Sequence, residues 1–286
     1  MKRHLLIAVA ALVVAAGTMV ALPSSRAAEA PPMGGGYTNV IPITVTDPSV
    51  KEIAGALFTP QGVGPFPAVV YMSGCSGLNV PAVHQMEKVV IDRMLSKGIA
   101  TLIVDPFTPR GEEKGICAKV IDVVTAFKDR DQAVLQLFQR GGDDFVAAVQ
   151  ALKAMSNIDP NKIVLQGYSY GAISALYATD TKTPGTHDTK IVGLVAYYPY
   201  CYDGVDPSVP TLVLIGEQDD WTPAAACQAV KGKANVEVVV YPGATHAFVV
   251  PRDKPVDVLG HHIAYDEKLA KEAQERAEAF IASHVK

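Results

Sequence analysis

Short apolar segments alternate with amphipathic segments along most of the chain. The apolar segments predict strands at residues 41–46, 51–59, 67–71, 99–106, 162–167, 191–197, 211–215 and 236–241. The amphipathic segments predict helices at residues 83–97, at 117–155 with a break near Gly141 and Gly142, at 172–179 and at 266–284. This alternation predicts an α/β fold with a mostly parallel central sheet flanked by helices on both faces.

The first 27 residues have a different pattern from the rest of the chain. A basic head at residues 2–4 precedes an apolar, uncharged run at residues 5–22, and small residues suited to cleavage follow. This is the layout of a secretory signal peptide. The run is also long enough for a permanent membrane anchor, but a glycine and a threonine within it favour cleavage. We therefore expect residues 1–27 to be a signal peptide and the mature protein to be periplasmic or secreted, without a stable membrane anchor.

The remaining sequence predicts one domain. Residues 28–40 are rich in Pro and Gly and predict a flexible lead-in, and no repeat or linker interrupts residues 41–286. With 49% hydrophobic residues the chain can bury a large core, which excludes a disordered protein. The net charge of −4 and the lack of any Lys/Arg cluster exclude a nucleic-acid-binding protein. Removal of residues 1–27 takes away Lys2, Arg3 and Arg26 and leaves a net charge of −7, which suits a monomer.

The most informative motif is a Gly-x-Ser-x-Gly sequence at residues 167–171. It follows a predicted strand and precedes a predicted helix, where such a serine is held in a tight, strained turn with its hydroxyl exposed. The alternative is a turn of small residues that only packs a helix against a strand. The flanking strand and helix favour the first interpretation, so we predict that Ser169 is a nucleophile.

A serine hydroxyl needs a general base to take its proton. Of the seven histidines, His246 follows the strand predicted at 236–241 and would lie at the same sheet edge as Ser169. An ordinary loop histidine is the alternative interpretation of His246. The adjacent His261 and His262 are interpreted as a solvated pair, because neighbouring side chains diverge and no metal-ligand spacing accompanies them.

The base in turn needs an acid that orients it and stabilises its positive charge. The loop after the strand predicted at 211–215 offers Glu217, Asp219 and Asp220. An acid here gives the chain order serine, acid, histidine that α/β-hydrolases have. We choose Asp219 as the acid and keep Asp220 as the alternative.

A glycine-rich loop at residues 74–77 predicts backbone donors for a developing oxyanion, with a plain turn as the alternative. The backbone amides of Cys75 and of Tyr170, the residue after the serine, are the candidate donors. Three side chains near strand ends are candidate substrate contacts: Arg110, Trp221 and Tyr198. Arg110 suits a substrate carboxylate, and a surface salt bridge is its alternative role. No metal or organic cofactor is predicted.

Several stretches of the sequence resemble the dienelactone hydrolase family of α/β-hydrolases. They are residues 73–78 (SGCSGL), 105–107 (DPF), 167–172 (GYSYGA), 216–219 (GEQD) and 241–248 (YPGATHAF). The resemblance implies an α/β-hydrolase fold with Ser169 as nucleophile, Asp219 as acid and His246 as base. It also implies Cys75 and Tyr170 as oxyanion donors. The namesake enzymes use a cysteine nucleophile, so the serine of this chain favours esterase chemistry over hydrolysis of dienelactone itself.

All four cysteines follow predicted strand ends: Cys75, Cys117, Cys201 and Cys227. An even number of cysteines in an exported chain is typical of disulfides, and free buried thiols are the alternative. Because sequential strands of the implied fold are usually neighbours, we expect Cys201 to pair with Cys227 and Cys75 to pair with Cys117.

Together these features predict an exported serine hydrolase that cleaves a small-molecule ester or lactone through an acyl-enzyme, without a cofactor. Two further hypotheses remain open. The same three residues are suited to acyl transfer or peptide cleavage, and the same fold is suited to a non-catalytic periplasmic binding protein.

Overall fold

The computed structural model describes residues 30–183 and 190–286 of the chain. The signal peptide predicted at residues 1–27 lies outside these described residues. Among the residues that are described, no helix has the length and apolar character needed to cross a membrane.

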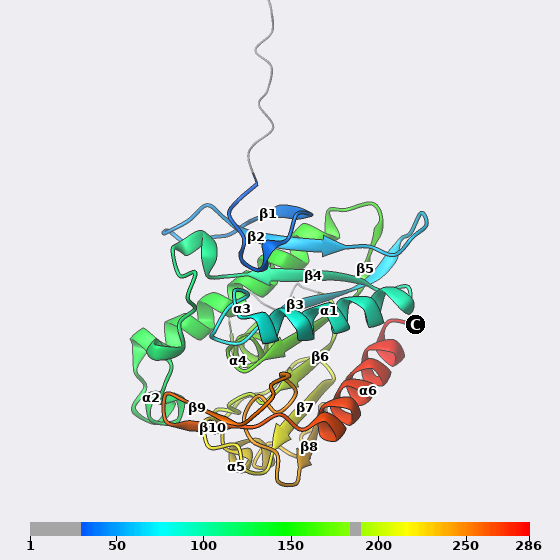
Figure 1. The fold of residues 1–286 in the computed structure, drawn as a ribbon. Coiled ribbons are helices and arrows are strands. Elements are labelled where there is room, and N and C mark those ends of the chain that lie inside the picture. The colour runs from blue at the N-terminus through cyan, green and yellow to red at the C-terminus, as the bar shows by residue number, and fades with distance from the viewer. Residues whose placement is uncertain (1–29, 184–189) are drawn as a thin grey trace, which may run out of the picture.

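An eight-stranded sheet forms the centre of the protein, in the order β1-β2-β4-β3-β5-β6-β7-β8 (Figure 1). The strands are β1 (Val40–Thr44), β2 (Glu52–Phe58), β3 (Phe66–Met72), β4 (Ala100–Asp105), β5 (Ile158–Tyr168), β6 (Ile191–Tyr197), β7 (Thr211–Gly216) and β8 (Val236–Tyr241). The pairs β1–β2 and β2–β4 are antiparallel, and all pairs from β4 to β8 are parallel. Every residue of β4 and β7 is buried, as expected for strands covered on both faces.

Helices cover both faces of this sheet. On one face lie α1 (Pro81–Ser96) and α6 (Glu267–His284), and on the other lie α3 (Gln132–Lys153) and α4 (Tyr170–Thr179) (Figure 1). The connections contain α2 (Val123–Asp129), α5 (Ala224–Gln228) and three 3₁₀ turns, η1 (Gly34–Gly36), η2 (Thr108–Arg110) and η3 (Cys117–Lys119). The predicted single-domain α/β fold is confirmed. A separate hairpin of β9 (Val256–Val258) and β10 (His261–Ile263) was not predicted.

The helix break predicted near Gly141 and Gly142 is wrong, because α3 runs through both residues. A Cβ atom on Gly141 would lie 2.2 Å from Ser174 Oγ of α4. Glycine therefore serves here to let two helices pack closely rather than to end one. The break lies earlier, between α2 and α3. Arg130 adopts a left-handed conformation with φ of 55° and ends α2, and the side chain of Asp131 caps the start of α3.

The flexible lead-in predicted at residues 28–40 is also wrong from residue 34 onward. Gly34 is buried and its N–H donates to Asp105 Oδ2 at 2.7 Å. The Tyr37 hydroxyl donates to Glu87 Oε2 of α1 at 2.8 Å. Two buried carboxylates thus fix the segment against α1 and the end of β4, a constraint that its Pro and Gly content does not reveal.

Glu87 is the most unusual titratable group in this region, because its side chain is fully buried. Burial raises its pKa to about 8, although the hydrogen bond from Tyr37 opposes the shift. Its Oε1 has no hydrogen-bond partner among the described residues. The folded protein therefore favours the protonated, uncharged form of this carboxyl group.

We predict that Glu87→Gln removes a pH dependence of stability. Because the folded pKa lies above the unfolded value, the folded state binds the proton more tightly. Stability from this group is full below the unfolded pKa near 4.5 and is lost as pH rises towards about 8. Over that window wild type should lose about 1.4 kcal/mol per pH unit relative to the variant. Urea unfolding at several pH values measures the difference.

The matched control is Glu113→Gln, since Glu113 is exposed. Its unfolding free energy should follow that of wild type at every pH. Parallel curves for wild type and the Glu87 variant would show that Glu87 is ionised in the folded protein.

Candidate active site

Ser169 occupies a turn between β5 and α4 that only a glycine-flanked sequence can form. Its φ of 49° and ψ of −111° lie in a region that non-glycine residues rarely adopt. A Cβ atom on Gly167 would lie 2.3 Å from the carbonyl oxygen of Gly171, and one on Gly171 would lie 2.3 Å from that of Met72. Both glycines are required by this close backbone approach, and together they hold the serine at the carboxyl edge of the sheet.

The loop after β8 brings a histidine to this serine. The Nε2 atom of His246 lies 3.0 Å from Ser169 Oγ, and His246 is 2% exposed. Two hydrogen bonds fasten its loop to the loop after β7. The Gly243 N–H donates to Glu217 Oε2 at 3.0 Å, and the carbonyl of Ala244 accepts from the N–H of Gln218 at 2.9 Å. Glu217 is thus a positioning group for the loop rather than a partner of the imidazole.

Asp219 is the carboxylate that faces the histidine. Its Oδ2 lies 2.8 Å from His246 Nδ1, which assigns the Nδ1 proton to this bond and leaves the Nε2 lone pair towards Ser169. Its Oδ1 accepts from the backbone N–H groups of Trp221 and Thr222 at 3.0 and 2.7 Å. The Thr222 hydroxyl lies 2.9 Å from Oδ2. The carboxylate is therefore held in one orientation.

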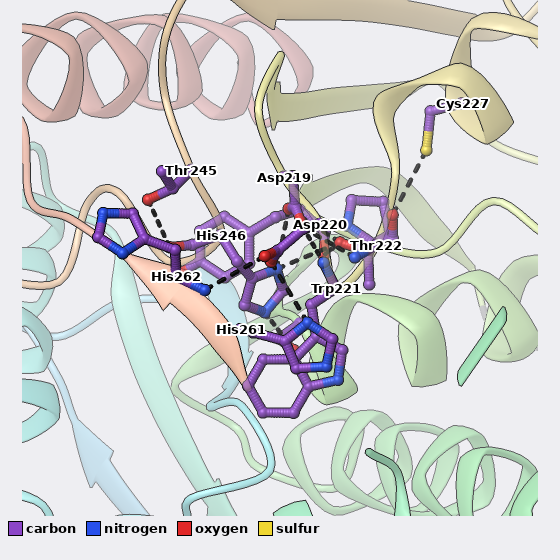
Figure 2. Close-up of polar contacts among 12 residues, drawn as sticks. Asp219, Asp220, Trp221, Thr222, Cys227, Thr245, His246, His261 and His262 are labelled. Atoms are coloured by element: carbon purple, nitrogen blue, oxygen red, sulfur yellow. Dashed lines mark hydrogen bonds and ion pairs between the residues drawn. The ribbon is translucent and has the colours of Figure 1, made fainter. Parts of the chain in front are cut away.

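Asp220, the second candidate acid, points away from His246. Its Oδ1 lies 3.3 Å from Nδ1 of His261, and its Oδ2 accepts from the backbone N–H of His262 (Figure 2). The interpretation of His261 as a solvated residue is wrong, because its ring stacks on Trp221 with centroids 4.5 Å apart and planes at 10° (Figure 2). Within residues 30–183 and 190–286, no three His, Cys, Asp or Glu side chains gather closely enough to hold a metal ion.

Backbone strain gathers at the same edge of the sheet. Of five non-glycine residues with positive φ in the described chain, three belong to this site: Ser169, Tyr198 at φ 41° and Ala247 at φ 53°. Strained residues persist only where surrounding contacts hold them, and they are concentrated at functional sites. The strain at Tyr198 and Ala247 was not visible in the sequence, because neither lies in a recognisable turn motif.

The loop predicted to supply oxyanion donors lies beside the serine. A Cβ atom on Gly74 would lie 3.4 Å from Ser169 Cβ, which places the Cys75 backbone next to Ser169. Tyr170 is the first residue of α4, so its N–H has no partner within the helix. The structure therefore brings both candidate donors to the serine.

The disulfides pair as predicted, Cys75 with Cys117 and Cys201 with Cys227. The first of them ties the loop next to Ser169 to the segment that follows η2. The same two segments also share a backbone hydrogen bond of 2.7 Å, from the N–H of Ile116 to the carbonyl of Cys75. The loop beside Ser169 is therefore anchored at two points.

A cavity of about 290 Å³ opens in front of Ser169 and His246. Its walls are mostly apolar and include Val80, Val83 and Met86, before and within α1, and Val258 and Ile263 of the hairpin. Trp221 and Tyr198, two of the predicted substrate contacts, also line it. Such a site suits an apolar small molecule that is held by a few polar groups.

Arg110, the third predicted substrate contact, does not lie in this cavity. Its side chain is 2% exposed and pairs with Asp47 at 2.7 Å and with Asp144 at 2.8 Å. The guanidinium is held by these two carboxylates, which lie far away in the sequence, and by the carbonyl of Pro106, so the substrate-contact prediction is corrected. Its ion pair is also buried rather than on the surface.

The cation that does line the cavity is Arg252, which no sequence motif singled out. Its Nε has no hydrogen-bond partner among the described residues. Burial lowers its pKa, and the neighbouring Tyr198 opposes that shift. Its place in the sequence could have indicated this role, because Arg252 follows His246 by six residues and belongs to the same loop.

The sheet is mostly parallel, and its strand-to-helix turn presents a serine to a histidine and an aspartate from later loops. This arrangement defines an α/β-hydrolase. The chain belongs to the dienelactone hydrolase family, whose model matches residues 53–285. The family resemblance found in the sequence is thereby confirmed. Membership makes the protein a carboxylic ester hydrolase.

Solved structures of the same fold are similar over most of the chain. A dienelactone hydrolase-like promiscuous phosphotriesterase from metagenomic libraries has 17% identity and a TM-score of 0.61, covering 86% of this chain and 98% of its own. An esterase from Thermogutta terrifontis has 17% identity and a TM-score of 0.59, with 88% and 94% covered. A dienelactone hydrolase from Anabaena variabilis has 16% identity and a TM-score of 0.57, with 86% and 97% covered. No curated protein matches the sequence.

Proposed function

We propose that the protein is an exported serine hydrolase that cleaves small carboxylic esters or lactones through an acyl-enzyme. The observation that carries this proposal is the line of hydrogen bonds from Asp219 through His246 to Ser169, with lengths of 2.8 and 3.0 Å. Each member occupies the position that its role requires, and the imidazole tautomer set by Asp219 leaves a lone pair for the serine proton.

The reaction follows from this geometry in two halves. Ser169 Oγ attacks the ester carbonyl carbon while His246 Nε2 takes the hydroxyl proton. The oxyanion accepts hydrogen bonds from the amides of Cys75 and Tyr170. When the tetrahedral intermediate collapses, Nε2 gives the proton to the leaving alcohol oxygen. A water molecule then repeats the sequence on the acyl-enzyme, which releases the acid and restores the serine.

The surroundings of His246 support this cycle. Tyr198 and Trp221 contact its ring, with centroids 4.9 and 5.2 Å away, and shield it from water. In such surroundings the charge of the imidazolium interacts strongly with Asp219. The same carboxylate thus orients the neutral ring and stabilises the charged one.

Export is part of the proposal. The signal-peptide pattern at residues 1–27 directs the chain out of the cytoplasm, and the two disulfides form in an oxidising compartment. The periplasm or the exterior of the cell satisfies both requirements.

Arg252 supports a particular kind of ester. It is a cation in an otherwise apolar cavity, and its buried Nε lacks a protein partner among the described residues. A carboxylate on the substrate would pair with this cation, and bidentate pairing with a guanidinium is among the stronger polar contacts. We therefore propose esters that carry an acidic group as favoured substrates.

We predict that a fluorophosphonate probe labels the protein once, at Ser169. Ser169→Ala should abolish labelling and lower kcat on short aryl esters by about 10³-fold or more, because the nucleophile is lost. Labelling is checked by intact mass and peptide mapping. Wild-type protein that is neither labelled nor active would favour a non-catalytic binding protein. Cleavage of peptides in preference to esters would favour a peptidase, and transfer to alcohols in preference to hydrolysis would favour an acyltransferase.

We predict opposite outcomes for two adjacent aspartates. Asp219→Asn should lower kcat by about 10³- to 10⁴-fold, because an amide no longer favours the productive imidazole tautomer. Asp220→Asn should leave kcat close to wild type, since its carboxylate contacts His261 and His262 instead. Steady-state kinetics with one aryl ester compares them, and equal losses in both variants would contradict the assignment.

We predict that Arg252→Leu raises KM for an aryl ester that bears a carboxylate by about 10-fold or more, and leaves the neutral isostere little changed. Lys254→Leu, an exposed cation two residues away, is the control and should change neither KM. A uniform change for both substrates would indicate that Arg252 only shapes the cavity.

A further inference from the structure

Two hollows of very different size meet at Ser169. The larger is the cavity of about 290 Å³ described above. The smaller leaves about 10 Å³ in which the centre of a water-sized group can move. Cys75, Ser169 and Trp221 line both, so they stand between the two.

The position of the histidine decides which part of an ester enters which hollow. His246 lines the larger hollow and is not among the residues that line the smaller one. Its Nε2 must hand a proton to the departing alcohol oxygen. The alcohol part of the substrate therefore lies in the larger hollow, and the acyl substituent is directed to the other side of the serine.

The smaller hollow has the chemistry of an acyl subsite. The candidate oxyanion donors Cys75 and Tyr170 both line it, so a bound carbonyl oxygen lies at its mouth. The remaining walls are largely apolar, from the side chains of Val120, Val123, Phe138 and Ile173. The hollow is much the smaller of the two and, with these walls, suits a substituent as small as a methyl group.

The walls of this hollow are tied in place. Val120 follows Cys117, which is bonded to Cys75, and the Val120 carbonyl accepts a hydrogen bond from Trp221 Nε1 at 3.3 Å. Val123, Phe138 and Ile173 are each at most 2% exposed and lie on α2, α3 and α4. Widening the hollow would require several packed elements to move together.

We propose that the smaller hollow is an acyl subsite that restricts open-chain substrates to acetyl esters, while the larger hollow takes a bulky, largely apolar alcohol part that carries the acidic group proposed to face Arg252. This inference rests on the proposed serine-hydrolase function and names its substrate class. Each extra methylene of the acyl chain meets a packed apolar wall, and a misfit of this size typically costs about 10-fold or more in kcat/KM.

The test is a series of para-nitrophenyl esters with acetyl, butyryl and hexanoyl groups. For wild type, kcat/KM should be about 10-fold or more higher for the acetate than for the butyrate. The value for the hexanoate should be lower than that for the butyrate. Val123→Ala removes two methyl groups from the wall and should reduce the acetate preference by about 10-fold. Val120→Ala should act in the same direction, which keeps the test valid if one variant folds poorly.

Two matched variants separate this subsite from general effects. Val124→Ala removes the same atoms from the neighbouring position of α2, outside the lining of the hollow, and should leave the acyl profile unchanged. Val83→Ala, in the larger hollow, should change the profile across methyl, phenyl and naphthyl acetates but not the acyl profile.

The outcomes distinguish the inference from the function on which it rests. Two outcomes would overturn the acyl subsite alone, in a protein that is labelled by the fluorophosphonate and turns over esters. One is cleavage of the hexanoate as efficiently as the acetate. The other is an acyl profile that neither Val120→Ala nor Val123→Ala changes. Absence of labelling and of turnover on every ester would overturn the proposed function, and the acyl subsite with it.

Discussion

The contact between Gly171 and the end of β3 is the constraint on which the site depends. With a Cβ position 2.3 Å from the Met72 carbonyl, α4 can begin this close to the sheet only because residue 171 has no side chain. That closeness forces the turn at Ser169 into its strained conformation and aims the hydroxyl out of the sheet edge. Every other functional group has to be brought to this fixed point.

Asp219 and His246 reach that point as one unit. The loops after β7 and β8 are joined by the bonds of Glu217 and Gln218, so Asp219 and His246 share a support. Trp221 then ties the same loops to the Val120 carbonyl, and Val120 lies three residues from the disulfide that anchors the loop beside Ser169. Hydrogen bonds and one disulfide thus connect the loops after β7 and β8 with the loop beside Ser169. These links limit the relative motion of the groups that the proposed reaction brings together.

Much of this arrangement could be predicted because its signals are local. The buried strands are continuous apolar runs, the serine turn has its two glycines, and Asp219 and His246 directly follow strands, so parallel pairing alone brings them to one edge. Arg110 could not be placed, because its partners Asp47 and Asp144 are 63 and 34 residues away and neither belongs to a motif. The hairpin that carries His261 has two strands of three residues each, too short for a periodic pattern.

Arg110 and Arg252 show why position matters more than residue type for the chemistry of a cation. Two carboxylates and the Pro106 carbonyl engage four of the five N–H donors of Arg110 and make it part of the framework, and removing Arg110 would leave both carboxylates without their cation. Arg252 has an unpartnered Nε among the described residues and lines the cavity in front of Ser169. Arg252 lies on the side of the leaving alcohol, whereas the acyl side is lined largely by apolar walls that a disulfide and packed helices hold in place. The site is therefore asymmetric about its nucleophile, with polar recognition on one side and steric exclusion on the other.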